Sequence, residues 1–144
     1  MQVKIPAASY TDEARFRQEH ERLILGLPTI VAHASQIPNP GDTLVYDWLG
    51  LPLVTMRDRD GEVGSFLNVC RHRGMRLLEQ EGQTCQRSLV CPYHQWTYGL
   101  DGTLRNIPLQ ESFGDINPDD LGLRPVPTEV RGGIIWVLGQ PGGE

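Results

Sequence analysis

Short runs of β-branched and other apolar residues, separated by turn residues, dominate the chain after Pro28. Runs of about four to eight such residues bounded by Gly, Pro, Asn and Asp are typical of strands, and Asp60-Gly61 and Asp101-Gly102 are strong hairpin signals. The segment 111–127 is rich in Pro, Asp and Gly and predicts a long surface loop. We therefore expect a mostly antiparallel β protein with strands at 29–34, 43–48, 53–57, 63–69, 88–90, 96–98, 103–107 and 134–138.

The first part of the chain follows a helical period instead. Apolar side chains from Phe16 onward recur near the spacing of one helix face, and Gly26 is a suitable stop. Thr11 is the expected N-cap, with acidic residues in the favourable first turn. We expect a helix at about 11–25 and interpret His20 on its face as a packed or half-exposed histidine rather than a ligand.

Size and charge limit the function. The 144 residues are the common size of one domain, so we expect a single domain over residues 1–144 that needs no disulfides to hold its core. The formal net charge of −5 argues against a nucleic-acid partner, which requires a basic face. The apolar runs are too short to span a bilayer and the N-terminus lacks an apolar signal region. We expect no membrane partner.

The candidate metal ligands lie in two short segments, Cys70-Arg71-His72 and Cys91-Pro92-Tyr93-His94. A [2Fe–2S] Rieske centre binds one iron through two cysteines and the other through two histidines. The four residues Cys70, His72, Cys91 and His94 therefore predict such a cluster, with each segment contacting both irons. A structural zinc site is the alternative, although zinc fingers usually group Cys with Cys and His with His. If this arrangement had arisen by chance, half of the chain's four histidines would have to lie at ligand spacing from two of its three cysteines by accident.

Longer stretches around these pairs resemble a known family. Asn68–Gly74, Cys91–Tyr98 and Asp101–Leu104 resemble the Rieske domain of ring-hydroxylating oxygenase large subunits, the Rieske non-heme iron oxygenases. Ile37–Asp42 and Gly132–Val137 resemble the same region, so the likeness covers nearly the whole chain. The resemblance implies a Rieske-type antiparallel β-sandwich with an N-terminal helix and a small cluster-binding subdomain at about 68–108.

Residues beside the four candidates are expected to shape and tune the cluster. Gly74 lets the first segment turn close to it, and Arg73 and Tyr93 flank the ligands. In respiratory Rieske proteins a Ser and a Tyr hydroxyl bond to sulfur, and the equivalent positions here are Trp96 and Tyr98. Because Trp96 has no hydroxyl, we expect a low reduction potential, about −150 mV at the low end of the Rieske range. Tyr98 is interpreted equally well as a core aromatic.

The chain departs from the family pattern at two points. The family often has Gly after the second histidine, and this chain has Gln95, which could adopt a positive φ only with strain. Once the four ligands are assigned, only His20 and His33 remain. They do not fit a mononuclear iron site of two histidines and a carboxylate. We therefore expect no catalytic mononuclear iron domain in this chain and no oxygenase activity from it alone.

Respiratory Rieske proteins carry an extra cysteine in each cluster segment, and the two join as a disulfide. The corresponding positions here are Met75 and Tyr93, so we expect a reduced, cytoplasmic setting. Cys85 has no remaining partner and is interpreted as an ordinary residue of the connector.

Two functions remain at this point. The first is electron transfer by the N-terminal domain through which electrons enter a Rieske oxygenase, and the second is a stand-alone Rieske ferredoxin. The N-terminal helix favours the first. The expected partners are a ferredoxin or flavin reductase as electron donor and an oxygenase catalytic domain or subunit as acceptor. Arg71 and Arg73 beside His72 are either solvated arginines or a docking face for an acidic partner.

Overall fold

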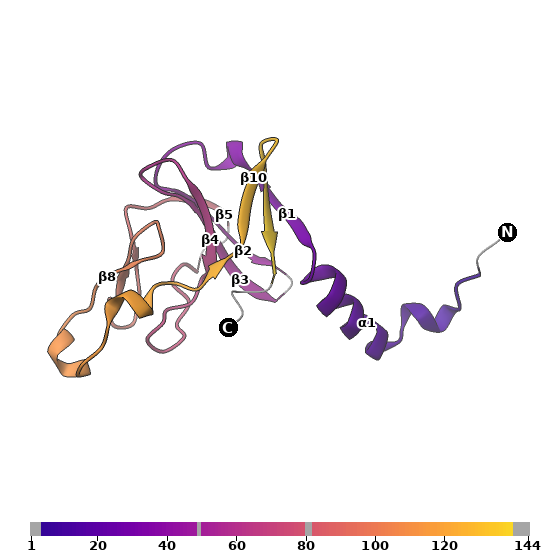
Figure 1. The fold of residues 1–144 in the computed structure, drawn as a ribbon, viewed down its shortest axis with the longest axis horizontal. Helices are drawn as coiled ribbons and strands as arrows, with labels where there is room; N and C mark the ends of the chain where they lie inside the picture. The colour runs from indigo at the N-terminus through magenta and orange to yellow at the C-terminus, as the bar shows by residue number, and fades with distance from the viewer. Residues whose placement is uncertain (1–3, 49, 80–81, 140–144) are drawn as a thin grey trace.

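The protein is described by a computed structural model that covers residues 4–48, 50–79 and 82–139. Within these residues the strands form three antiparallel sheets, with the orders β1-β11-β10, β5-β2-β3-β4-β9 and β6-β7-β8 (Figure 1). The mostly β, antiparallel fold class is therefore confirmed. The strands are β1 (Pro28–His33), β2 (Asp42–Trp48), β3 (Leu51–Arg57), β4 (Val63–Leu67), β5 (Gly82–Cys85), β6 (Leu89–Val90), β7 (Thr97–Tyr98), β8 (Leu104–Asn106), β9 (Pro125–Val126), β10 (Thr128–Arg131) and β11 (Ile134–Leu138).

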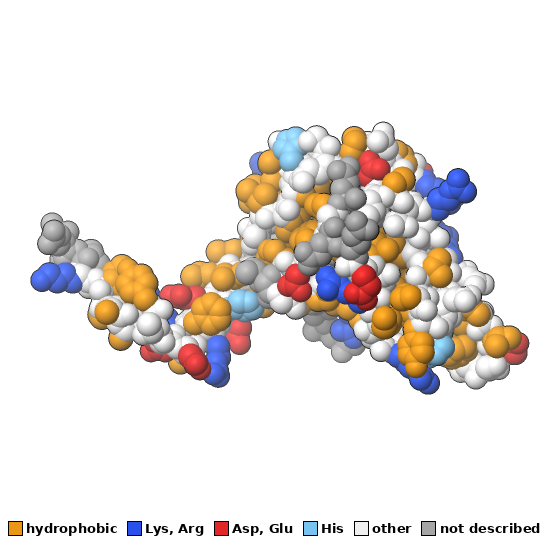
Figure 2. Space-filling model, turned by 180° about the vertical axis from the view of Figure 1, so that it is seen from behind, with side chains coloured by type: hydrophobic (Ala, Val, Ile, Leu, Met, Phe, Trp, Pro, Cys, Tyr) orange, Lys and Arg blue, Asp and Glu red, His pale blue; other side chains and the backbone are white. Residues whose placement is uncertain are grey.

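An N-terminal helical arm projects from the β body (Figures 1 and 2). It consists of the 3-10 turn η1 (Ala7–Tyr10), the helix α1 (Glu13–Glu19) and a π-helical turn η2 (His20–Ile24). None of these elements contains a buried residue, and hydrophobic side chains lie on the surface of the arm (Figure 2). No helix of the described residues is long and apolar enough to cross a membrane.

The predicted N-cap of this helix is wrong by one residue. The side chain of Asp12, not Thr11, accepts hydrogen bonds from the backbone N–H groups of Ala14 (2.9 Å) and Arg15 (3.0 Å). Thr11 instead closes η1, because its N–H donates to the Ala8 carbonyl. The preceding 3-10 turn uses Thr11, so the cap moves to the next residue that can accept these bonds.

The central five-stranded sheet carries the core that supports the functional loops. Val45, Val54 and Met56 from β2 and β3 belong to the same buried cluster as Cys70 and Cys91. A second cluster packs Trp48 and Leu53 of this sheet with Val137 of β11. The loops that carry the candidate ligands are therefore built on a hydrophobic core rather than on other loops.

Three strands were not predicted. β5 has the sequence Gly-Gln-Thr-Cys and lies at the edge of its sheet, where it pairs with β2. β10 is mostly exposed and pairs with β11, and β9 falls inside the predicted loop 111–127. That region also contains the 3-10 turns η4 (Gln110–Phe113) and η5 (Pro118–Leu121). The three unpredicted strands are too short or too polar to show an alternating apolar pattern, so pairing with a neighbouring strand defines them. A further 3-10 turn, η3 (Ala34–Gln36), follows β1.

Candidate metal centre

The first loop, residues 68–78, leaves β4 and returns beside it. The side chain of Asn68 is fully buried; it accepts a hydrogen bond from the N–H of Leu78 (3.1 Å) and donates one to the Leu78 carbonyl (2.8 Å). Inside this closure the Cys70 N–H donates to the Met75 carbonyl (2.8 Å), and the Gly74 N–H donates to the Cys70 carbonyl (3.0 Å). Gly74 has φ +71°, which glycine adopts at no steric cost. These bonds fold the loop around Cys70.

The second loop, residues 90–97, joins β6 to β7 and has the same internal frame. The Cys91 N–H donates to the Trp96 carbonyl (2.8 Å), and the Gln95 N–H donates to the Cys91 carbonyl (3.0 Å). Gln95 has φ +59°, so it takes the left-handed conformation that Gly74 takes in the first loop. The conformation expected to strain a non-glycine residue is therefore present at Gln95.

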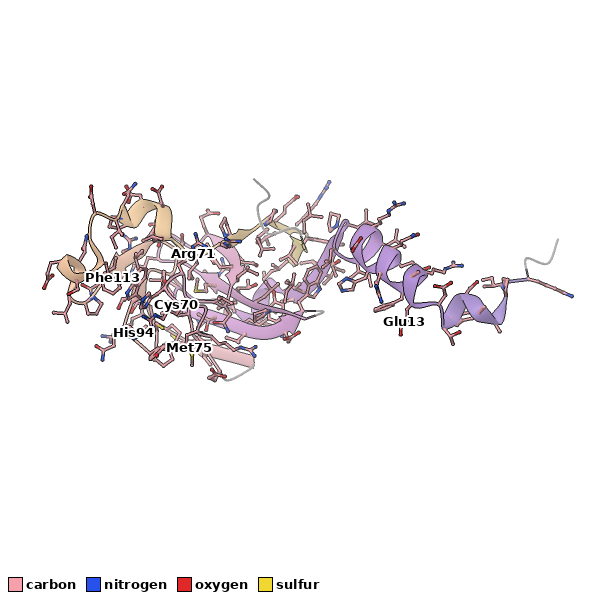
Figure 3. The ribbon with its side chains drawn as sticks, turned by 90° about the horizontal axis from the view of Figure 1, so that it is seen from below. Glu13, Cys70, Arg71, Met75, His94 and Phe113 are labelled. Atoms are coloured by element: carbon pink, nitrogen blue, oxygen red, sulfur yellow. The ribbon has the colours of Figure 1, made fainter. Side chains whose placement is uncertain are left out.

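The two loops bring the four candidate ligands to one end of the molecule. The imidazole rings of His72 and His94 have centroids 4.7 Å apart, with their planes inclined by 64°. Cys70 and Cys91 are buried, each residue being 2% exposed, and they belong to the same buried cluster. Figure 3 shows Cys70 and His94 at the end of the molecule opposite the arm.

This donor set fits a dinuclear cluster. In the described part of the chain, Nδ1 of His94 is buried and has no hydrogen-bond partner, as a nitrogen reserved for a metal would be. No three His, Cys, Asp or Glu side chains of the described residues converge on a single metal position. A [2Fe–2S] centre with two cysteines and two histidines needs only two protein ligands per iron. The paired cysteines and paired histidines match that requirement.

Local electrostatics act on the candidate ligands. Burial raises the pKa of the Cys70 thiol; hydrogen bonds from the Tyr98 hydroxyl and the His72 backbone oppose this, and the neighbouring Cys91 adds to it. Partial burial lowers the pKa of His72, and electrostatic repulsion from the neighbouring His94 and Arg73 side chains lowers it further. His72 is therefore biased toward the neutral imidazole, the form that binds a metal.

Tyr98 is both a core residue and a neighbour of the candidate ligands. It is fully buried, and its hydroxyl lies 3.2 Å from Sγ of Cys70 and accepts a hydrogen bond from the N–H of Arg71 (3.0 Å). Burial, and then the contact with Cys70, raise the pKa of Tyr98 above its usual value. The phenol therefore keeps its proton and can donate it in a hydrogen bond to the Cys70 sulfur.

Two other aromatic residues surround the histidines. Trp96 is buried and stacks on His72, with centroids 4.9 Å apart and planes inclined by 7°. Phe113 of η4 meets the rings of both residues edge-on, at 5.3 Å from His72 and 5.6 Å from Trp96. Sequence reasoning missed Phe113, although a lone aromatic residue in a polar loop was the available signal.

The charged and aromatic residues next to the candidate ligands differ in their exposure to solvent. Arg73 is exposed, whereas Arg71 is half-buried and its Nε is enclosed without a hydrogen-bond partner among the described residues. Tyr93 is 58% exposed, and its ring packs on His94 with centroids 3.8 Å apart. Of the two arginines that flank His72, Arg73 is the more exposed.

The remaining histidines and the third cysteine lie on other elements. His20 is on the arm against Phe16, with ring centroids 6.0 Å apart. His33 caps η3, where its Nδ1 accepts a hydrogen bond from the N–H of Ser35 (3.2 Å). Cys85 is an exposed thiol at the end of β5.

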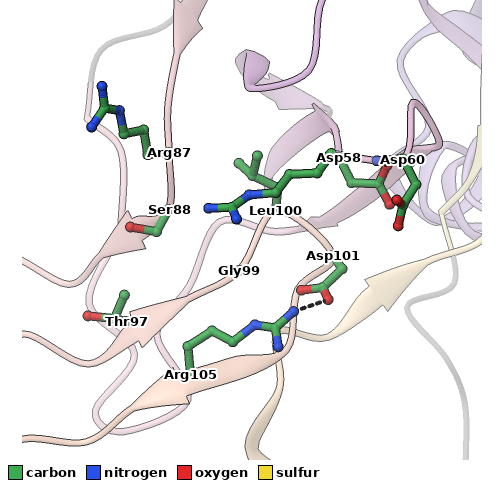
Figure 4. A pocket seen from close by; sticks show the side chains of 10 residues that line it. Asp58, Asp60, Arg87, Ser88, Thr97, Gly99, Leu100, Asp101 and Arg105 are labelled. Atoms are coloured by element: carbon green, nitrogen blue, oxygen red, sulfur yellow. Dashed lines mark hydrogen bonds and ion pairs between the residues drawn. The ribbon is translucent and has the colours of Figure 1, made fainter.

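A polar cavity of about 430 Å³ lies where the β3–β4 turn meets the β7–β8 hairpin (Figure 4). It is lined by both acidic and basic side chains, and none of the four candidate ligands is among them. In its wall Arg105 donates to the Asp101 carboxylate (2.5 Å). Burial raises the pKa of Asp101, but hydrogen bonds from Thr103 and the charge of Arg105 outweigh it, and the net shift is downward.

Comparison with known proteins agrees with this geometry. The sequence pattern of the Rieske [2Fe-2S] domain matches residues 28–127, which include both loops. The chain belongs to the Rieske [2Fe–2S] domain family. Family membership implies a Rieske-type [2Fe–2S] cluster as the cofactor of this Rieske domain.

Curated relatives of the Rieske domain are oxygenase subunits. The oxygenase subunit of carnitine monooxygenase from Escherichia coli (strain K12) is 35% identical over 137 residues, which are 95% of this chain and 36% of that protein. Biphenyl 2,3-dioxygenase subunit alpha from Rhodococcus jostii (strain RHA1) is 36% identical over 129 residues, covering 88% of this chain and 28% of that protein. The Rieske domain therefore spans about a third of the length of these relatives.

Solved structures give the same result. The quaternary ammonium Rieske monooxygenase CntA, in complex with an inhibitor, superposes with a TM-score of 0.88 at 28% identity, over 97% of this chain and 39% of that one. Naphthalene 1,2-dioxygenase from Rhodococcus sp. bound to indole also has a TM-score of 0.88, at 32% identity, over 97% of this chain and 32% of that one. The Rieske fold expected from the resemblance is confirmed.

Proposed function

We propose that this chain is the domain through which single electrons enter a Rieske non-heme iron oxygenase, with Cys70, His72, Cys91 and His94 as the cluster ligands. A bound [2Fe–2S] cluster would supply one-electron redox chemistry. The observation that carries the proposal is the convergence of two buried cysteines and two adjacent histidines on twin loops. The oxygenase relatives support it over a stand-alone ferredoxin.

The chain's own residues have separate tasks in this function. Cys70 and Cys91 would hold one iron from the buried side, and His72 and His94 would hold the other nearer the surface. The Tyr98 hydroxyl would donate to the Cys70 sulfur and stabilise the more electron-rich, reduced state. Trp96, at the position where respiratory Rieske proteins have a serine, has no hydroxyl to donate to sulfur, and for this reason we propose a low reduction potential.

The ligand set is tested by replacing each cysteine with serine in the full chain. Cys70→Ser and Cys91→Ser should each abolish visible absorbance and the stoichiometry of two irons and two acid-labile sulfides. Cys85→Ser is the matched control, since Cys85 is exposed and lies on β5, and it should keep the full cluster. For the histidines, His72→Ala and His94→Ala are compared with His20→Ala on the arm. Stoichiometric zinc in a colourless wild-type protein would refute the proposal.

We propose a ferredoxin or flavin reductase as electron donor, docking at the surface around Arg73. Arg73 is exposed beside His72, where a positive charge would speed the encounter with an acidic donor. Arg73→Glu should slow reduction by the donor and weaken its salt dependence, with the visible spectrum unchanged. Arg131→Glu, at an exposed position on β10, should leave the rate near wild type. Equal rates of reduction for both variants would show that the donor docks elsewhere on the protein.

We propose an oxygenase catalytic domain or subunit as the electron acceptor. The relatives are several times longer than the part that matches this chain. With a reductase and NADH, this chain alone should be reduced and should pass electrons to an external acceptor without forming hydroxylated product. Oxygen consumption coupled to product with this chain as the sole oxygenase component would contradict the assignment.

A further inference from the structure

The segment Leu109–Gly114 has an unusual backbone for a surface loop. Leu109 lies in the left-handed region at φ +54° and ψ +46°, and Gly114 follows η4 at φ +75°. The Leu109 side chain is 71% exposed, so its own burial does not compensate for this strain. Backbone strain in a native structure persists where surrounding contacts hold it. The described contact that the segment makes with the candidate centre is through Phe113.

Phe113 and Trp96 enclose His72 from two directions. Trp96 covers the face of the imidazole, at 4.9 Å and 7°, while the Phe113 ring approaches at 5.3 Å and 81°. Phe113 also meets Trp96 edge-on, at 5.6 Å and 74°. We call Trp96 and Phe113 together the aromatic wall. Figure 3 shows Phe113 at the same end of the molecule as Cys70 and His94.

The aromatic wall has two physical effects on a bound cluster. Packing on the face and flank of the imidazole restricts rotation of the His72 ring, and the two large aromatic rings exclude water from that side. Reduction adds one negative charge to the cluster and its ligands. Because water stabilises added charge better than hydrocarbon does, exclusion of water disfavours the reduced state and lowers the reduction potential.

We propose that Phe113 is a positioning residue for His72, and that with Trp96 it keeps water from the histidine side of the cluster and holds the reduction potential low. This inference rests on the proposed ligand set. It assigns a role to the segment between β8 and η5, which the sequence indicates only as surface loop. It also adds a cause of low potential that is independent of the hydroxyl missing at Trp96.

The test is a redox titration of the cluster-loaded full chain, followed by electron paramagnetic resonance of the reduced state. Phe113→Ala should raise the midpoint potential and shift the g-values, because water enters and the His72 ring is less constrained. Phe113→Leu should give a smaller upward shift, since it keeps an apolar side chain without the ring. Deuterium exchange followed by pulsed resonance should detect solvent closer to the cluster in Phe113→Ala than in wild type.

Two control variants isolate the effect. Leu109→Ala removes an exposed side chain from the same segment, and Phe16→Ala makes the same chemical change on the arm, where Phe16 is 62% exposed. Both should keep the wild-type potential and g-values. An intact cluster with wild-type potential in Phe113→Leu and in any folded Phe113→Ala protein would overturn the inference, as would an equal shift in Leu109→Ala. A wild-type protein that binds no cluster would instead refute the proposed function.

Discussion

The two loops of the candidate centre share one hydrogen-bond frame but place different residues at its left-handed position, Gly74 in the first loop and Gln95 in the second. Their supports differ as well. The second loop is closed by the β6–β7 ladder directly at its ends, whereas the first has a single isolated bridge between Val69 and Arg76. The comparison teaches that a strained residue is tolerated where paired strands already fix the loop ends. The less supported loop depends on glycine and on the Asn68 closure.

Of the changes that test the two loops, removal of the Asn68 side chain should have the largest effect on the unfolding free energy. Asn68→Ala leaves the backbone groups of Leu78 without their partners in the protein interior, which should cost about 2–4 kcal/mol for two lost buried hydrogen bonds. Urea unfolding measures this, with visible absorbance reporting on cluster retention. Asn106→Ala, at an exposed position on β8, should change the unfolding free energy by less than about 0.5 kcal/mol. Equal losses would show that the first loop does not depend on Asn68.

Exchanging the left-handed residues should give opposite signs in the two loops. Gly74→Ala forces a side chain into the left-handed region and should destabilise by about 1–2 kcal/mol. Gln95→Gly relieves strain, but glycine gains freedom in the unfolded chain, so the net stabilisation should be about 0.5 kcal/mol or less.

The control for this pair is Gly132→Ala. Gly132 has φ +60° and open space around the missing Cβ, like Gly74, but it lies in the β10–β11 turn. It should show a similar cost in unfolding free energy without loss of cluster absorbance. Loss of the cluster in this variant would mean that absorbance follows overall stability rather than loop geometry.

The sulfur contacts of the two loops are also unequal, because Cys70 contacts the Tyr98 hydroxyl. Tyr98→Phe removes a donor to the Cys70 sulfur, which should lower the reduction potential. A hydrogen bond of about 1 kcal/mol corresponds to a shift of about 40 mV for one electron. Tyr46→Phe removes a hydroxyl bonded to Thr55 and should leave the potential unchanged. A rise in the potential of Tyr98→Phe would mean that the phenol does not donate to sulfur.

The smallest effect concerns the β7–β8 hairpin behind the second loop. The pKa of Asp101 is lowered from 3.8, so its stabilising contribution is present above about pH 4 and is lost as pH falls through the depressed folded-state pKa. As an exposed group it should contribute less than about 0.5 kcal/mol. Unfolding of wild type and Asp101→Asn at pH 6 and pH 3 should give a difference that shrinks in acid. If the difference in stability were the same at both pH values, Asp101 would stabilise the protein by something other than its charge.

The sequence predicts the β class, the N-terminal helix and the meeting of two Cys–His segments, because alternation, turn residues and ligand spacing are local signals. It does not predict β5 or β10, whose strand character comes from pairing with β2 and β11. The sequence marks Phe113 only as a lone aromatic residue in a polar loop and does not predict its contact with His72, which spans 41 positions along the chain and depends on how η4 is placed. The expected strain at Gln95 is found at φ +59°, and the reason for its tolerance lies in the strand pairing around it.

Cys70 and Cys91 belong to the same buried cluster as Val45, Val54 and Met56 of the central sheet. This sharing has a consequence for the order of assembly in the cell. The central sheet contributes Val45, Val54, Met56 and Phe66 to that buried cluster, whereas most of the other members lie on the two loops and on the small β6-β7-β8 sheet. We therefore expect the loop end to close only when iron and sulfide are bound. Maturation would then complete this end of the protein, and a supply of iron would limit the number of active molecules.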